Sequence, residues 1–299
     1  MTSKRSWHES PPPTAATPRT DRATYGADVA DTAELLGVPF MGWQRLVADR
    51  GLEHVGGLVA HREVDVSTPR QSGKSSLVLA VAVRKMLAAP GSWVTYTTAS
   101  RLAGRRKLLK TWWPLIRRSP LRDMFKATQG TGSESLECVN GSVLLLLSAD
   151  ESSGHGDSYD LSFLDECWSL SEAAEQAVRP AMAARPAAQL WCLSTAGTRR
   201  STFWRDKVKA GRAAAELGVA DGQVFVEWAA DPKADLTDPA TWPVFMPALG
   251  RTIHEATVAA DLTSMPFRQW RRAYCNVWDD EIDDGWRFIP RDLWAAAGP

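Results

Sequence analysis

The chain carries a glycine, a lysine and a serine in succession at Gly73, Lys74 and Ser75, the residue types that bind phosphate groups in a tight turn. Backbone N–H groups of such a turn converge on phosphate oxygens, the lysine neutralises their charge, and the hydroxyl is a ligand for Mg²⁺. We therefore predict that residues 68–75 bind Mg-ATP, with Ser75 as a metal ligand. The predicted ATP-binding residues of this loop are Arg70, Gln71, Ser72, Gly73, Lys74 and Ser75.

Thr68 weakens this prediction, because the pattern G-x-x-x-x-G-K-[ST] has its first glycine at that position. The triplet alone could belong to an ordinary turn, so its context must support the assignment. Val64 and Val66 alternate with polar residues and indicate a short strand before the loop, and residues 75–89 indicate a buried helix after it. This order is the setting of a phosphate loop, in which the positive end of the helix dipole faces the anion.

Two adjacent carboxylates, Asp165 and Glu166, follow a short apolar run at residues 161–164. In a parallel sheet, ligands gather beyond the carboxyl ends of the strands, where this pair would lie beside the phosphate loop. Asp165 would hold Mg²⁺, and Glu166 would orient the water that attacks the terminal phosphate. The predicted catalytic residues are therefore Lys74, Asp165 and Glu166, and the alternative for the acidic pair is a solvated loop.

Two weaker signals accompany these. Ser194 and Thr195 end another apolar run at residues 190–193, where small hydroxyl groups suit a sensor of the terminal phosphate; a strand running into a turn fits the spacing equally well. Gln44 follows Trp43, and a glutamine amide matches the N6/N7 edge of adenine, so we predict that Gln44 contacts ATP. A polar helix residue is the alternative for Gln44.

Strands and helices alternate along the chain. Strands are expected around residues 64–66, 93–98, 143–147, 161–164, 190–193 and 224–228, and helices at 75–89, 100–118 and 254–276. This alternation predicts an α/β fold with a mainly parallel sheet and helices on both faces. We expect residues 1–33, with three consecutive prolines, to be a flexible arm, 34–222 to be the core, and 223–299 to form a small C-terminal linker region.

Composition excludes several classes of protein. The 299 residues hold 35 Lys and Arg against 35 Asp and Glu, so nucleic-acid binding must be argued from local charge. Basic residues cluster at 101–126 and 199–212, as solvated faces or as surfaces that track a phosphate backbone, and one arginine could act as a finger. The four cysteines form no CxxC pair, which argues against zinc or disulfides and favours a cytoplasmic protein. No apolar run reaches the ~18–20 residues of a membrane span.

These residues together resemble the large terminase subunit of tailed bacteriophages, the ATPase that pumps DNA into proheads. The similarity runs from about residue 35 to residue 294 and rests on Gln44, residues 69–75, the Asp165–Glu166 pair and residues 193–197. Residues 242–250 and 267–278 resemble the end of that family's ATPase region. The family tolerates a missing first glycine and carries an arginine in the loop, which suits Thr68 and Arg70.

The resemblance implies a RecA-like P-loop ATPase that works as a ring of identical subunits on the portal of a prohead. Double-stranded DNA and a small terminase subunit would be its partners, ATP and Mg²⁺ its cofactors, and the host cytoplasm its location. The family's metal-dependent nuclease would begin near Pro299, so we do not expect nuclease activity from this chain. Where some relatives place a finger arginine, this sequence has Gly154-His155-Gly156.

Other functions share part of this pattern. A superfamily 2 helicase or DNA translocase would have the glutamine, the phosphate loop and the acidic pair, but it needs a second RecA-like domain of roughly 150 residues. A nucleotide kinase would lack the acidic pair. A nucleotide-binding assembly subunit that has lost hydrolysis would keep the loop without turnover.

Overall fold

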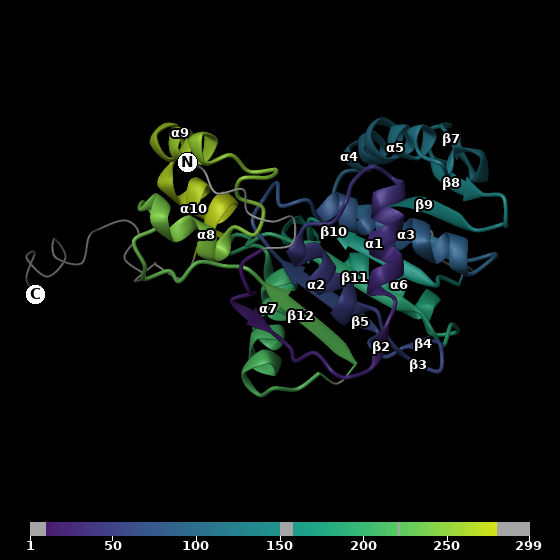
Figure 1. The fold of residues 1–299 in the computed structure, drawn as a ribbon, viewed down its shortest axis with the longest axis horizontal. Helices are drawn as coiled ribbons and strands as arrows, with labels where there is room; N and C mark the ends of the chain where they lie inside the picture. The colour runs from purple at the N-terminus through teal and green to yellow at the C-terminus, as the bar shows by residue number, and fades with distance from the viewer. Residues whose placement is uncertain (1–9, 150–157, 221, 280–299) are drawn as a thin grey trace, which may run out of the picture.

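A nine-stranded sheet runs through the centre of the molecule (Figure 1). The computed structural model describes residues 10–149, 158–220 and 222–279. In spatial order the strands are β1 (Ala15–Ala16), β12 (Gln223–Glu227), β5 (Glu63–Ser67), β11 (Gln189–Ser194), β10 (Leu161–Asp165), β6 (Trp93–Thr98), β9 (Val143–Ser148), β8 (Ser135–Cys138) and β7 (Phe125–Thr128). The strands from β12 to β9 run parallel, and β1, β8 and β7 are antiparallel to their neighbours. The expected mainly parallel α/β sheet is confirmed.

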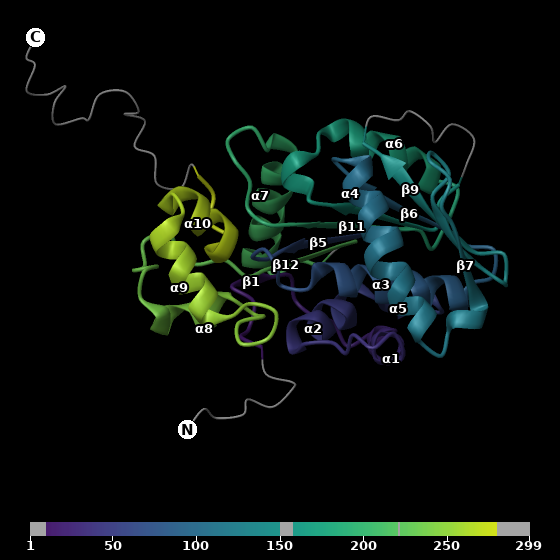
Figure 2. The ribbon, with the colours of Figure 1, turned by 90° about the horizontal axis from the view of Figure 1, so that it is seen from above.

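Helices cover both faces of this sheet (Figure 2). One face carries α1 (Gly26–Leu35), α2 (Gly42–Gly51) and α3 (Lys74–Ala88). A continuous helical stretch made of α4 (Arg101–Arg106), the π-helical segment η1 (Lys107–Trp112) and α5 (Trp113–Arg118) packs into the same hydrophobic core as α3. The other face carries α6 (Glu172–Met182) and α7 (Thr202–Glu216). Short helical turns lie at η2 (Arg122–Met124) and η3 (Cys167–Ser169). Helix α3 is buried over residues 77–83, as expected of a helix that is apolar on all sides.

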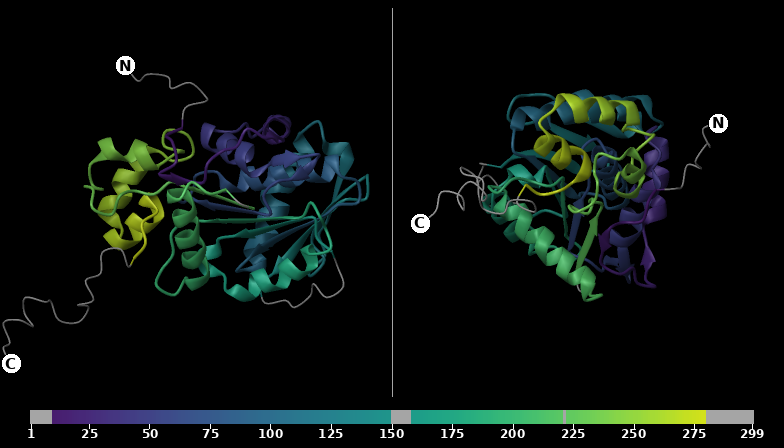
Figure 3. Two further views of the ribbon diagram at one scale, coloured as in Figure 1. Left: turned by 90° about the horizontal axis from the view of Figure 1, so that it is seen from below. Right: turned by 90° about the vertical axis from the view of Figure 1, so that its left-hand side faces the viewer.

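Residues 230–277 form a helical module beside the sheet (Figure 3). It contains η4 (Pro239–Thr241), α8 (Trp242–Phe245), α9 (Glu255–Ser264) and α10 (Phe267–Cys275), packed around their own core with Trp242 and Trp270 fully buried. The single helix predicted over residues 254–276 is wrong. The chain breaks at Met265 and Pro266, because proline has no N–H to continue the helical hydrogen bonds.

The expected domain boundaries need two corrections. Residues 10–33 are not a flexible arm: they form β1, β2 (Ala23–Thr24) and most of α1, and β2 joins a small antiparallel sheet with β3 (Glu53–Val55) and β4 (Leu58–Val59). Their order comes from backbone pairing, as when Thr14 N–H donates to Glu227 O at 2.8 Å, which hydropathy does not reveal. The boundary at 222 is also wrong, since β12 lies inside the sheet. Residues 1–9 and 280–299 lie outside the described residues.

Candidate active site

The phosphate loop connects the end of β5 to the start of α3, as the sequence predicts. Its backbone takes left-handed conformations at Gln71 (φ 60°) and Gly73 (φ 94°). A Cβ atom on Gly73 would lie 2.8 Å from the methyl carbon of Met41, so only glycine fits without a shift. Thr68, where the pattern has its first glycine, is fully buried, and its N–H donates to Ser194 O at 3.0 Å. The backbone of residue 68 therefore joins the loop to the neighbouring strand.

Lys74 folds back over this loop. Its ammonium donates to Thr68 O at 3.2 Å and to Pro69 O at 3.0 Å. Burial lowers the pKa of Lys74 to about 8, although the negative charges of Asp165 and Glu166 act in the opposite direction. The lysine is thus close enough to the acidic pair for their charges to interact, although Lys74 and Asp165 are 91 residues apart in the chain.

Gln44 and Trp43 of α2 donate hydrogen bonds to the backbone of the phosphate loop. The Gln44 amide donates to Gly73 O and to Ser76 Oγ, both at 2.8 Å, and its oxygen accepts from Met41 N–H. The indole N–H of Trp43 donates to Ser72 O at 3.0 Å. Both side chains are buried, so their role in the structure is to hold the loop backbone, and contact between Gln44 and adenine stays a prediction.

The acidic pair lies at the carboxyl end of β10. Strand β11 separates β10 from β5, with Asp165 paired to Leu193 and Ser194 paired to Ser67, so the three strand ends meet at one edge of the sheet. Asp165 is buried and accepts from the Tyr96 hydroxyl at 2.6 Å. Burial and the charge of Asp165 raise the pKa of Tyr96 well above its usual value, so the phenol keeps its proton and donates.

Glu166 differs from its neighbour in exposure and backbone. It is exposed, and its φ of 57° is left-handed, a conformation uncommon for a residue other than glycine. Its N–H donates to Asp165 Oδ1 at 3.0 Å, which fixes the two carboxyl-bearing residues relative to each other. Such local backbone strain is typical of functional sites. The arrangement leaves Asp165 held in place and Glu166 accessible to solvent.

Ser194 and Thr195 hold the edge together in the structure. Ser194 Oγ accepts from Trp168 N–H at 2.9 Å, which ties β11 to the turn after the acidic pair. Thr195 Oγ1 makes long contacts of 3.5 Å with Ala196 O and Arg272 O. A sensor role for either hydroxyl stays a prediction.

The residues fit a magnesium ion by their chemistry. Ser75 lies in the first turn of α3, and Asp165 is the last residue of β10; both offer the oxygen atoms that Mg²⁺ prefers. The two hydrogen bonds that Asp165 accepts, from Tyr96 and Glu166, orient its carboxylate and leave lone pairs for a metal or its waters.

The structure adds site residues that the sequence did not single out. The Lys107 ammonium lies 2.7 Å from Ser75 Oγ, and Tyr96 supports Asp165 from β6. Lys107 was visible only as one member of a basic run, and Tyr96 only as a strand residue. No spacing rule links either of them to the loop, because their proximity comes from the order of strands in the sheet.

The C-terminal module contacts the loop directly. Arg70 N–H donates to Ala273 O at 2.9 Å, and the Thr252 hydroxyl bonds to Gln71 O. The guanidinium groups of Arg70 and Arg272 lie 5.6 and 5.8 Å from the ring centre of Trp168. The module and the phosphate loop are therefore packed as one unit.

Some cations of each basic cluster, at residues 101–126 and 199–212, form ion pairs with acidic side chains. In the first, Arg101 and Arg105 pair with the buried carboxylate of Glu134. In the second, Lys207 pairs with Glu63 and Glu175, and Arg212 pairs with Glu227. The exposed cations of the first cluster that remain on the α4–η1–α5 stretch include Arg106, Lys110, Arg117 and Arg118. Arg199, Arg200 and Lys209 of the second cluster are exposed as well, so both clusters offer positive surface and the first has more exposed cations.

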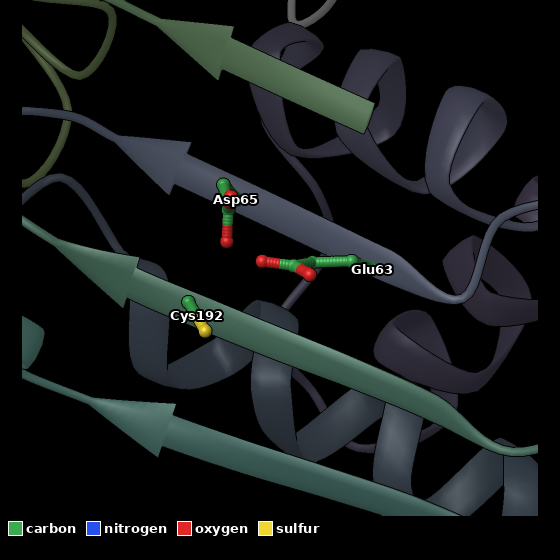
Figure 4. A group of neighbouring side chains, drawn as sticks. All are labelled: Glu63, Asp65 and Cys192. Carbon is green, nitrogen blue, oxygen red and sulfur yellow. The ribbon is translucent and has the colours of Figure 1, made fainter. Parts of the chain in front are cut away.

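A separate group of side chains projects from β5 and β11 (Figure 4), on the side where Arg179 of α6 and Lys207 of α7 bond to Glu63. Ligand atoms of Glu63, Asp65 and Cys192 lie within 4.8 Å of one another. The Lys207 ammonium bonds to Glu63, so a side-chain cation already balances this group. Burial, with the charge of Glu63, raises the pKa of Asp65 to about 7. The group is an ion network that joins the sheet to α7.

Comparison with known proteins identifies the fold. No family model and no curated protein matches the chain. The HK97 bacteriophage large terminase superposes with a TM-score of 0.70 at 19% identity, over 85% of this chain and 55% of that chain. The ATPase domain of the Thermus phage P74-26 large terminase superposes with a TM-score of 0.58 at 16% identity, over 81% of this chain and 95% of that chain. This chain has the fold of a large-terminase ATPase domain.

The terminase fold agrees with the expected RecA-like core, in which a phosphate loop and an acidic pair share one sheet edge. The chain spans 55% of the length of the HK97 large terminase. Residues 154–156, where some terminases have a finger arginine, lie outside the described residues. Among the described residues, no helix is long and apolar enough to span a membrane.

Proposed function

We propose that this chain is the ATP-hydrolysing motor subunit of a phage terminase, which translocates double-stranded DNA into proheads. The observation that carries this proposal is the sheet edge where Lys74 and the Asp165–Glu166 pair come together in a terminase ATPase fold. A nucleotide-binding loop alone would support binding. The exposed carboxylate of Glu166 beside it supplies what hydrolysis needs.

Each residue of the edge has a defined task in this proposal. The N–H groups of the loop and the Lys74 ammonium bind the β- and γ-phosphates. Ser75 and Asp165 would hold Mg²⁺, which neutralises the charge that develops on the phosphate oxygens. Glu166 accepts a hydrogen bond from the attacking water and orients it in line with the bond that breaks. Tyr96 keeps Asp165 in the orientation that the metal requires.

The proposed DNA surface is the α4–η1–α5 stretch. Its exposed cations, Arg106, Lys110 and Arg117, have the charge that a phosphate backbone attracts. The fold similarity to terminases supports the further partners: a small terminase subunit, a portal on the prohead, and other copies of this chain in a ring. The proposal places the protein in the host cytoplasm, where packaging occurs.

The alternative enzyme, a superfamily 2 helicase, is less well supported. It requires a second RecA-like domain, and the described residues after β12 form a helical module with its own core instead. The alternative of a subunit without hydrolysis remains testable at Glu166.

The test is ATP hydrolysis by the full chain, alone and with DNA and proheads, against two variants. Lys74→Ala should lose nucleotide binding and turnover, because its ammonium supplies the positive charge inside the loop. Glu166→Gln should bind ATP normally and hydrolyse it about 10²–10⁴-fold more slowly, the usual loss when a residue that activates water is removed. Glu172→Gln, which changes an exposed acid at the start of α6, is the matched control.

Normal turnover by Glu166→Gln would refute the assignment of the catalytic residue. Absence of turnover in the unmutated chain under all these conditions, with ATP binding intact, would favour the assembly subunit without hydrolysis.

A further inference from the structure

The helix that follows β6 contains an irregularity next to the nucleotide site. The segment η1, Lys107–Trp112, has π-helical hydrogen bonding between α4 and α5. Because a π turn joins residues five apart, it brings Lys107 and Trp112 close to one face; on a regular α-helix they would be about 140° apart. Single π turns occur frequently at functional sites. The irregularity therefore directs two particular side chains toward the sheet edge.

Lys107 contacts a residue of the proposed magnesium site directly, and Trp112 contacts the tyrosine that positions the other. The Lys107 ammonium donates to Ser75 Oγ at 2.7 Å. The buried ring of Trp112 lies 4.6 Å from the ring of Tyr96, whose hydroxyl donates to Asp165. One turn of helix thus contacts Ser75 directly and Asp165 indirectly, through Tyr96.

The helix packs closely against the sheet. The position of the Lys107 ammonium is therefore set by the packed helix and not only by a flexible side chain. Leu108 and Trp112 are buried, and a Cβ atom on Gly104 would lie 2.4 Å from a methyl carbon of Leu146. Arg106 and Lys110, on either side of Lys107, are exposed. Lys107 itself is half-buried and differs from them in its direction.

Positive charge is concentrated around the start of α3. Burial is the largest cause of the lowered pKa of Lys74, and the charges of Arg70 and Lys107 contribute to it. Three cations close to one helix N-terminus repel one another, and a bound polyanion would offset that repulsion. The contact between Lys107 and Ser75 indicates which phosphate of a bound nucleotide the Lys107 ammonium would contact. Ser75 would help to hold the Mg²⁺ that neutralises the charge of the terminal phosphates, so an ammonium beside this serine would lie near the same end of the triphosphate.

We propose that Lys107 is a phosphate-binding residue that contacts the terminal phosphate of a bound nucleoside triphosphate, and so lets the site distinguish a triphosphate from a diphosphate. This inference rests on the proposed nucleotide site. It gives η1 a role in the chemistry of the site, in addition to its place in the proposed DNA surface.

The experiment compares the affinities of Mg-ATPγS and Mg-ADP for the full chain by isothermal titration calorimetry. Lys107→Gln keeps a hydrogen-bond donor for Ser75 but removes the charge. It should weaken Mg-ATPγS binding about tenfold or more, the effect of losing one charge-assisted hydrogen bond, and change Mg-ADP binding less than about twofold. Lys107→Arg should retain part of the preference. Lys209→Gln, which removes the charge of an exposed lysine on α7, is the matched control and should change neither affinity.

Equal weakening of both nucleotides by Lys107→Gln would overturn the inference, because it would show that Lys107 only supports Ser75 and α3. Unchanged affinity for both would overturn it as well. Thermal melting of each variant checks that it is folded, and Lys107→Arg provides the same comparison if Lys107→Gln is not. If the unmutated chain fails to bind Mg-ATPγS, the proposed function fails and this inference with it; if it binds normally and the variants match it, only this inference fails.

Discussion

Asn276, directly after α10, joins the C-terminal module to the carboxyl ends of three strands, at Ser67 of β5, Ala196 after β11 and Trp228 after β12. Its side chain is fully buried, and its φ of 56° is a left-handed conformation that asparagine tolerates better than most residues. The amide oxygen accepts from Ala196 N–H, and the amide nitrogen donates to Ser67 Oγ and to Trp228 O, both at 2.9 Å. We predict that Asn276→Gly, which permits the same backbone conformation, loosens the module from the sheet.

The size of the effect follows from the groups that lose a partner. Ser67 Oγ keeps its hydrogen bond to Glu227, at 3.1 Å. The Ala196 N–H and the Trp228 carbonyl lose the bonds that Asn276 makes to them. Each buried polar group left unpaired costs about 1–3 kcal/mol, so the free energy of unfolding should fall by about 2–6 kcal/mol.

Urea unfolding followed by tryptophan fluorescence measures this change, since Trp228, Trp242 and Trp270 are buried around the junction. Thr252→Ala is the control. It removes an exposed contact between the same module and the loop, and should cost less than about 1 kcal/mol. A loss below about 1 kcal/mol for Asn276→Gly, with ATP turnover unchanged, would refute the view that these hydrogen bonds hold the module in place.

Three further predictions test other parts of the structure. Tyr96→Phe removes the hydrogen bond to Asp165, so urea unfolding should show a loss of about 1.5–3 kcal/mol and ATP hydrolysis should require more Mg²⁺; an unchanged Mg²⁺ requirement would contradict the positioning role. Asp65 has a pKa raised to about 7 from 3.8, so the folded state binds more protons between pH 4 and 7, and stability falls as pH rises through that range. Between pH 4 and 7, the free energy of unfolding of Asp65→Asn should therefore rise relative to that of the unmutated chain, by up to about 1.4 kcal/mol per pH unit. Parallel pH profiles of stability for the two proteins would contradict this. Replacing the three exposed cations of the proposed DNA surface by alanine should reduce the slope of log affinity for DNA against log salt by about 0.9 for each DNA phosphate that is no longer neutralised, and an unchanged slope would place the DNA surface elsewhere.

The sheet could be predicted from the sequence because its strands are nearly continuous apolar runs. Residues 190–193 are buried on both faces, as central parallel strands are, and residues 143–147 are at least half-buried throughout, so this pattern is specific enough to locate both strands. The two-residue strand β1 could not be found this way, since it is held by backbone hydrogen bonds to β12 and has only half-buried alanines. The break at Pro266 could have been predicted from proline chemistry, but the periodicity over residues 254–276 masked it.

The candidate site was predictable only in part, for a related reason. Gly73, Lys74 and the acidic pair stand at the ends of strands, so the topology of a parallel sheet brings them together. Lys107 and Tyr96 lie inside a helical stretch and a strand, not at strand ends. Their positions at the site depend on a π turn for Lys107 and on the register of β6 against β10 for Tyr96. Neither feature has a signature in local sequence.

The place of β11 between β5 and β10 has a consequence for the order in which the protein folds. The phosphate loop and the acidic pair are both made before residue 189 is synthesised, but the strand that sets their distance comes later in the chain. Long-range pairing of this kind is slow, because the entropy of loop closure must be lost before the contacts form. A growing chain that ends before β11 therefore holds all of the predicted catalytic residues without an active centre. If the proposed function holds, we expect a chain that ends before β11 not to hydrolyse ATP, because β11 sets the distance between the phosphate loop and the acidic pair.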